Sequence, residues 1–144
     1  MISDTDRQLL ARHLAAENEH RMDDTLATLT EDCVFDDRGL GRVWHGREGA
    51  REYYDMWWSG FGATVHTERR HYTDDGAAIV ETHFRGVHEG EFLGIPPTGR
   101  EVDVELAIFI ELRDGLMTGE RFYWDVTGLL RQLGVTELPP ALAG

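Results

Sequence analysis

The stretch EVDVELAIFIELRDGLMTGERFYW, residues 101–124, determines the fold class that we expect for this chain. It contains two runs with the composition of strands, Glu101–Leu112 and Met117–Trp124, around the turn Arg113-Asp114-Gly115. An Asp-Gly turn between two such runs is a strong signal for an antiparallel hairpin. A second pair precedes it, with runs at Thr64–Thr73 and Ala77–Val87 around Asp74-Asp75-Gly76. The sequence therefore predicts a four-stranded antiparallel meander.

The residues before the meander have the periodicity of helices. The other expected elements are helices over residues 4–21 and 24–29, a short strand at Cys33–Asp36, a helix from Gly46 to Phe61 and a closing helix at Thr127–Leu133. Three helices followed by a meander is an α+β arrangement. We expect the helices to pack on one face of a curved, mainly antiparallel sheet and to leave a cone-shaped cavity. The length suits one domain over residues 1–144, with a loose tail at residues 136–144.

Composition excludes several classes of partner. The 144 residues carry 27 acidic and 14 basic side chains, and the net charge of −13 repels nucleic acid and anionic membrane surfaces. The sequence has no membrane-spanning apolar run and no signal-peptide pattern, so we expect a cytoplasmic protein. It also lacks the common motifs for nucleotides and zinc, so we expect neither a cofactor nor a metal. The single cysteine, Cys33, lies in an apolar run and is expected to be a buried, inert thiol.

Two motifs on either side of the last hairpin give the chain a family resemblance. They are GEFLGIPPTG at residues 90–99 and WDVTGLLRQLG at residues 124–134. Together they resemble the SnoaL-like proteins, which are polyketide and ester cyclases within the nuclear transport factor 2-like superfamily. The resemblance covers almost the whole chain and implies the α+β cone of that superfamily, which also contains ketosteroid isomerases and non-enzymatic binding modules.

The resemblance implies a role for Asp125. In SnoaL-like cyclases an aspartate at the matching position is the general acid/base of a cofactor-free aldol closure. Burial in an apolar cone would raise the pKa of such a carboxyl group and suit it to this work. Asp125 also directly precedes the closing helix, so a helix N-cap is the alternative. The chain departs from many relatives in having Gly119-Glu120-Arg121 where they have Glu-His-Trp, and Ile108 where an acid is frequent.

Two further residues match catalytic positions of the related isomerases. Asp37 follows the first strand, near the point where the isomerases have their catalytic base, and a solvated turn acid is the alternative interpretation. His13 falls on the first helix where the isomerases have an oxyanion-donating tyrosine, although a mid-helix histidine is more often a packing or surface residue.

The aromatic residues indicate a hydrophobic small-molecule ligand. The side chains expected to bind it are Tyr54, Trp57, Trp44, Tyr123 and Phe92. The segment Phe92–Gly99 would form a rim over the mouth of the cavity. The alternative is that these residues belong to an ordinary core and a dimer surface.

The favoured function is a cofactor-independent enzyme that acts on a hydrophobic, carbonyl-containing small molecule, by polyketide-cyclase or isomerase chemistry. Asp125 would move the proton, and Tyr54 or His13 would orient the developing oxyanion. The alternative is a non-catalytic module of the same fold that binds a small molecule or dimerises. Epoxide hydrolysis, a third possibility, needs two acids beside an arginine such as Arg85 or Arg121. The resemblance also implies a homodimer or a higher homo-oligomer.

Overall fold

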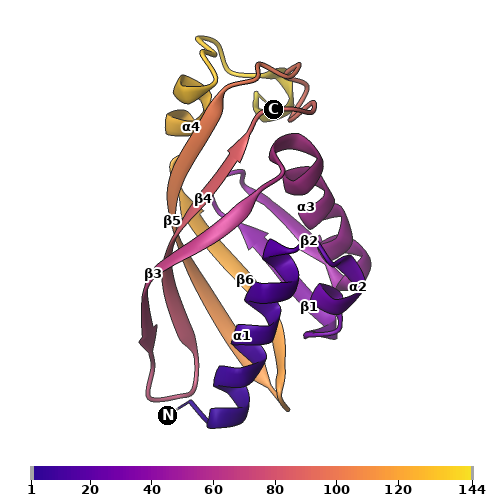
Figure 1. Ribbon diagram of the computed structural model, residues 1–144, viewed down its shortest axis with the longest axis vertical. Helices are drawn as coiled ribbons and strands as arrows, with labels where there is room; N and C mark the ends of the chain where they lie inside the picture. The colour runs from indigo at the N-terminus through magenta and orange to yellow at the C-terminus, as the bar shows by residue number, and fades with distance from the viewer. Residues whose placement is uncertain (1, 144) are drawn as a thin grey trace.

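The structure is a computed structural model that describes residues 2–143, and its strands form one curved sheet (Figure 1). The strands are β1 (Leu29–Asp37), β2 (Arg42–His45), β3 (Thr64–Tyr72), β4 (Ala78–Val87), β5 (Glu101–Arg113) and β6 (Leu116–Trp124). The helices are α1 (Asp4–Asn18), α2 (Met22–Leu26), α3 (Gly46–Phe61) and α4 (Val126–Gln132), with the 3-10 turn η1 (Pro140–Leu142). The order across the sheet is β2-β1-β6-β5-β4-β3, and β1 runs parallel to β6 whereas the other neighbours are antiparallel.

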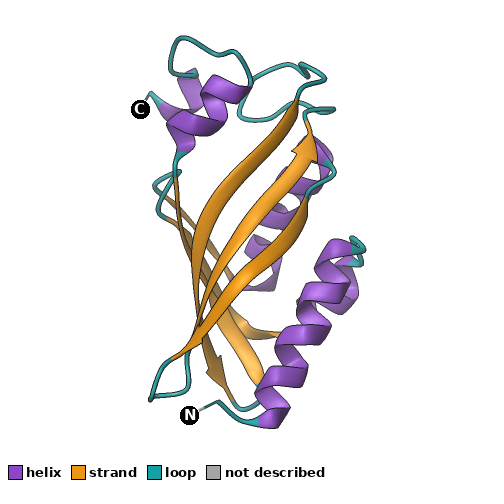
Figure 2. Ribbon diagram, turned by 60° about the vertical axis from the view of Figure 1, so that its left-hand side comes forward, coloured by secondary structure: helices purple, strands orange, loops and turns teal. Residues whose placement is uncertain are grey.

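Helices α1 and α3 lie on the same, concave side of the sheet (Figures 1 and 2). Asn18, at the end of α1, fixes this helix to β3 through hydrogen bonds of 2.9 and 2.8 Å with the backbone of Val65. Helix α3 packs on β1, where the Phe35 ring makes edge-on contacts with Tyr53 and Tyr54. The expected α+β cone, with helices on one face of a mainly antiparallel sheet, is confirmed.

The meander is confirmed as well, in strands β3 to β6. Its second turn has Asp114 and Gly115 in the left-handed region, with φ of 54° and 75°, as an Asp-Gly turn predicts. Helix α1 begins after Ser3, whose side chain accepts a hydrogen bond from the Asp6 amide. It ends at Asn18, three residues earlier than predicted.

Strand β1 is longer than the predicted Cys33–Asp36 and joins the sheet between β2 and β6. The alternation of polar and apolar residues is interrupted because Glu31 and Asp32 are consecutive exposed acids. The register with β6 also shifts before Val34. Gly119 permits this shift, since its φ is 131° and a Cβ there would lie 1.9 Å from the carbonyl oxygen of Val34. The irregular pairing is therefore the reason that the sequence pattern underestimated β1.

The outer face of the sheet carries a few apolar side chains. Ile79 and Phe109 are half-buried there, and Tyr123 is 43% exposed. The homodimer stays a prediction.

Cys33 is buried, as expected, and burial raises the pKa of its thiol. Within the described residues, every helix is too short or too polar to cross a membrane. In the C-terminal segment that we expected to be loose, the carbonyl of Ala141 accepts a hydrogen bond from Arg42.

Candidate functional site

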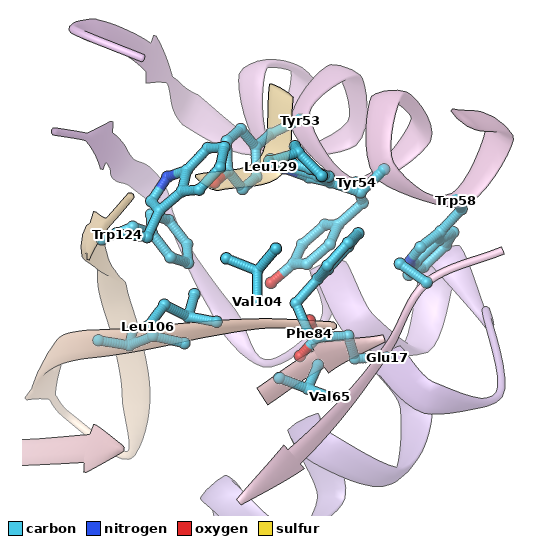
Figure 3. Close-up of a pocket in the computed structure, with 14 residues that line it drawn as sticks. Glu17, Tyr53, Tyr54, Trp58, Val65, Phe84, Val104, Leu106, Trp124 and Leu129 are labelled. Carbon is cyan, nitrogen blue, oxygen red and sulfur yellow. The ribbon is translucent and has the colours of Figure 1, made fainter. Parts of the chain in front are cut away.

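A largely apolar pocket lies between the concave face of the sheet and helices α1 and α3 (Figure 3). Its volume is about 590 Å³, including the part that is open to solvent. The lining residues are Glu17, Tyr53, Tyr54, Trp57, Trp58, Ala63, Val65, Phe84, Val104, Leu106, Ile108, Phe122, Trp124 and Leu129. Such a cavity, with apolar walls and a few polar groups, is typical of a small-molecule site.

The local structure explains why these side chains converge. Residues three or four apart on a helix share a face, so Tyr53 with Trp57 and Tyr54 with Trp58 form two adjacent rows on α3. The ring centroids of Tyr54 and Trp58 are 5.4 Å apart in a stacked arrangement. Alternate side chains of a strand share a face, so every second residue of β5 and β6 completes the opposite wall.

The polar end of the pocket is a buried group of side chains around His13, which we call the His13 cluster. Nε2 of His13 lies 3.1 Å from the Tyr54 hydroxyl, 3.3 Å from a carboxylate oxygen of Glu120 and 3.4 Å from one of Glu17. Helix α1 supplies His13 and Glu17 one turn apart, α3 supplies Tyr54, and β6 supplies Glu120. The Glu120 side chain is 5% exposed, whereas that of Glu17 is 18% exposed and lines the pocket (Figure 3). Glu17 is therefore the carboxylate that a ligand in this pocket can reach.

Thr28 determines which ring nitrogen of His13 faces the cluster. The Thr28 hydroxyl donates to the carbonyl of Thr25 at 2.6 Å, and its oxygen lies 2.7 Å from Nδ1 of His13. Because that hydroxyl has only one hydrogen to donate, its oxygen accepts a hydrogen bond from Nδ1–H. Nε2 is therefore the nitrogen that exchanges protons with the hydroxyl and the carboxylates of the cluster.

Burial and charge act in opposite directions on His13. Burial lowers its pKa, but the hydrogen bonds and charges of Glu120 and Glu17 outweigh this effect and raise the pKa from 6.5 to about 10. Burial also raises the pKa of the Glu120 carboxyl, against the opposing effect of His13. Burial raises the pKa of Tyr54 well above the usual tyrosine value, so its hydroxyl keeps its proton at neutral pH. The cluster therefore holds an imidazolium ion beside acidic groups.

This proton makes the stability of the protein depend on pH. The folded chain holds the His13 proton up to about pH 10, whereas an unfolded histidine releases it near 6.5, so the free energy of unfolding should fall as pH rises through this window. One extra bound proton corresponds to a slope of up to about 1.4 kcal/mol per pH unit. Urea unfolding across this pH window measures the slope in the wild type and in the double variant His13→Gln/Glu120→Gln. Equal slopes in the two proteins would show that His13 is neutral when folded.

Asp37 is fully buried behind the pocket wall, with 0% of its surface exposed. Its carboxylate accepts hydrogen bonds from the Tyr53 hydroxyl at 2.7 Å, from the Trp124 indole at 2.8 Å and from the Leu40 amide at 2.8 Å. Burial raises the pKa of Asp37, and these donors oppose the shift. The interpretation as a solvated turn acid is wrong, because Tyr53 and Trp124 cover the carboxylate. Asp37 instead orients two residues that line the pocket.

Asp125 does not have the apolar surroundings that we expected. It is the exposed N-cap of α4, and its carboxylate accepts a hydrogen bond of 3.0 Å from the Gly128 amide. It is not among the residues that line the pocket. Asp125 lies outside the pocket because Trp124 is the last inward-facing residue of β6 and the chain turns into α4 directly after it.

The expected ligand-binding aromatic residues divide into two groups. Tyr54 and Trp57 line the pocket. Trp44 packs against Tyr53 with ring centroids 4.8 Å apart, outside the pocket lining. Phe92 is buried against Trp57 and is part of the core, and Tyr123 faces outward because it alternates with Phe122 and Trp124. These three therefore do not contact the cavity, although each was expected to bind the ligand.

The sequence did not reveal Glu17 and Glu120 as members of the site. Signals for both were present: Glu17 follows His13 by one helical turn, and Glu120 alternates with inward-facing Phe122 on β6.

Among the described residues, no group of three or more His, Cys, Asp or Glu side chains is arranged to hold a metal ion. Arg85 pairs with Asp103 at 3.0 Å, and neither residue lines the pocket.

One protein family matches the chain. The SnoaL-like polyketide cyclase profile matches residues 7–133. A search among curated proteins finds no match.

Solved structures match over nearly the full length. A proposed SnoaL-like polyketide cyclase from Jannaschia sp. CCS1 has 21% identity and a TM-score of 0.82, and the match covers 94% of this chain and 96% of that one. TsrD from Streptomyces laurentii has 28% identity and a TM-score of 0.78, with coverage of 93% and 98%. A protein of ketosteroid isomerase-like fold from Catenulispora acidiphila has 16% identity and a TM-score of 0.75, with coverage of 98% and 97%. These matches agree with the nuclear transport factor 2-like fold expected from the sequence.

Proposed function

Because the chain belongs to the SnoaL-like polyketide cyclase family, we propose that it is a cofactor-independent enzyme that moves a proton on a hydrophobic, carbonyl-containing small molecule. The observation that carries this proposal is the meeting of Glu17 and Tyr54 at the polar end of an otherwise apolar pocket (Figure 3). A carboxylate and a hydroxyl group, both next to a buried imidazolium, are the groups that removal of a proton beside a carbonyl requires.

The apolar walls supply binding energy and exclude water. Burial of an aromatic or polycyclic ligand against Trp57, Phe84 and Leu106 is favourable by about 25 cal/mol for each Å² of apolar surface removed from water. Exclusion of water also strengthens every electrostatic interaction at the polar end of the pocket. A ligand would therefore bind with its apolar body along the walls and its carbonyl group beside the His13 cluster.

Glu17 is the base in this proposal. Its carboxylate takes a proton from the carbon next to the ligand carbonyl, and the electrons of that C–H bond become the enolate. The Tyr54 hydroxyl donates a hydrogen bond to the enolate oxygen, while the Nε2–H of His13 donates to the oxygen of Tyr54. In a cyclase, the enolate carbon then attacks a second carbonyl, whose C=O π electrons move to its oxygen, and this oxygen takes up the proton held by Glu17. In an isomerase, Glu17 returns the proton to another carbon. Both reactions begin with this one step.

The other acids fit the role less well. Glu120 is buried behind His13, and Asp37 already accepts three hydrogen bonds behind the wall. Asp125, the residue to which the family resemblance assigns the chemistry, is exposed and caps α4. We therefore assign the proton transfer to Glu17, with Tyr54 and His13 as its partners.

The test is hydrogen exchange in D₂O with aryl alkyl ketones, such as 1-(2-naphthyl)butan-1-one, whose exchange in buffer is slow. We expect proton NMR to show deuterium entering the carbon next to the carbonyl faster with the protein than without it. Fluorescence of the pocket tryptophans reports binding in the same samples. Saturable binding without any acceleration would contradict the proposal and favour a non-catalytic binding module.

A further inference from the structure

A second cavity lies under α1, on the other side of Glu17 from the pocket, and we call it the inner chamber. Its volume is about 420 Å³, including any part open to solvent. Leu10 and Leu14 of α1 lie over it, and residues of β3 to β6 form its floor. Glu17, Val65 and Ile108 line both cavities. The two cavities therefore adjoin at the residue that we assign as the base.

Thr82 on β4 lines the inner chamber and has a hydroxyl group that the fold does not use. The residue is 2% exposed, and its Oγ1 has no hydrogen-bond partner among the described residues. A buried hydroxyl without a partner destabilises a protein, and valine has the same shape without this penalty. Its neighbours on the same face of β4, Val80 and Phe84, are both apolar. An occupant of the chamber would therefore supply the partner that the described residues do not.

The charges around the chamber indicate which group would bind there. Its carboxylates, Glu120 and Glu17, only accept hydrogen bonds, and a threonine hydroxyl both donates and accepts. Arg70 also lines the chamber, but it is exposed to solvent. The imidazolium of His13 lines the chamber as well, but its charge is already paired with Glu17 and Glu120. A neutral hydroxyl group can donate to an acceptor and accept from Thr82, whereas an anion would meet the two glutamates. The chamber thus suits an alcohol.

We propose that the pocket and the inner chamber form one bipartite site for a hydroxylated ketone. The apolar body lies in the pocket, the carbonyl lies beside Glu17 and Tyr54, and a hydroxyl group on the far side of the carbonyl hydrogen-bonds to Thr82. The position of the carbonyl rests on the proposed function, but the use of the chamber is measured by binding alone.

The experiment compares matched probes by fluorescence titration. The probes are 2-naphthyl ketones whose alkyl arm of two to five methylene groups ends in a hydroxyl group, and the same ketones with a methyl group in its place. We expect the wild type to prefer the hydroxyl probe of the best length by about fivefold, the value of one neutral hydrogen bond. In Thr82→Val this preference should vanish while the affinity for the methyl probe stays unchanged. Without ligand, Thr82→Val should melt about 2–4 °C higher, because an unpartnered hydroxyl is removed.

Thr30 provides the matched control. It is a buried threonine of β1 that lines neither cavity, so Thr30→Val should keep the hydroxyl preference. A preference that is absent in the wild type, or that survives in Thr82→Val, would overturn the inference. Tighter binding of a probe that ends in a carboxylate would also overturn it and would indicate an anion site at Arg70. If no ketone binds at all, the proposed function fails as well, whereas equal binding of methyl and hydroxyl probes refutes only the use of the chamber.

Discussion

Replacement of Glu17 by glutamine is expected to lower the rate of proton exchange on a bound ketone by about 100- to 10,000-fold. This is the usual contribution of a positioned general base, and glutamine keeps the shape of the side chain but cannot accept the proton. The variant should still bind ketones within a few-fold of the wild type, because most of the contact surface is the apolar wall. The measurement is deuterium incorporation at saturating ketone, with binding followed separately by tryptophan fluorescence.

Glu19→Gln is the matched control for this prediction. Glu19 follows α1 two residues after Glu17, but its side chain is exposed and pairs with Arg21 at 2.7 Å. The Glu19→Gln protein should exchange the protons of the bound ketone at the wild-type rate. A Glu17→Gln protein that retains exchange within a few-fold would show that another group removes the proton. A parallel loss in both variants would point to a general effect of charge on α1.

Replacement of Asp37 by alanine is expected to lower the free energy of unfolding by about 3–5 kcal/mol. The change removes the acceptor for Tyr53, Trp124 and the Leu40 amide at once, and leaves these donors buried without partners. Urea denaturation followed by tryptophan fluorescence measures the loss. Ligand affinity should fall as well, because Tyr53 and Trp124 line the pocket.

Asp36, the neighbouring acid, provides the control for this prediction. Asp36 is half-buried and pairs with the exposed Arg38 at 2.8 Å, so Asp36→Ala should lower the free energy of unfolding by about 1 kcal/mol or less. If Asp37→Ala were as stable as Asp36→Ala, the network behind the pocket wall would have no structural importance. Asp37 would then be free for another role.

Much of the fold could be predicted because its signals are local. The Asp-Gly turns and the strand runs on either side of them specify the meander without reference to other parts of the chain. Strand β1 could be predicted only in part, because its irregular pairing with β6 depends on Gly119, which is 85 residues after Val34 in the sequence and next to it in the sheet. Such long-range contacts leave no local periodicity to detect.

The site was harder to predict for the same reason. The periodicity of α3 predicts that Tyr54 and Trp57 lie on the broad face of the helix that packs inward, and both line the pocket. His13 becomes chemically distinctive only where Glu120, more than a hundred residues later, meets it. The burial of Asp37 likewise depends on Trp124 and could not be inferred from the polar turn that follows it. The family resemblance suggested Asp125, and the sequence could not separate this role from a helix cap, because a cap and a catalytic aspartate at the end of a strand have the same local pattern.

The most direct test of this account is therefore the exchange rate of Asp125→Asn, measured beside the wild type and Glu17→Gln with the same ketone. Asparagine is as good an N-cap as aspartate, so the variant should fold normally. If Glu17 moves the proton, Asp125→Asn exchanges deuterium within a few-fold of the wild type while Glu17→Gln does not. Loss of exchange in Asp125→Asn, with Glu17→Gln still active, would contradict the account and return the chemistry to Asp125.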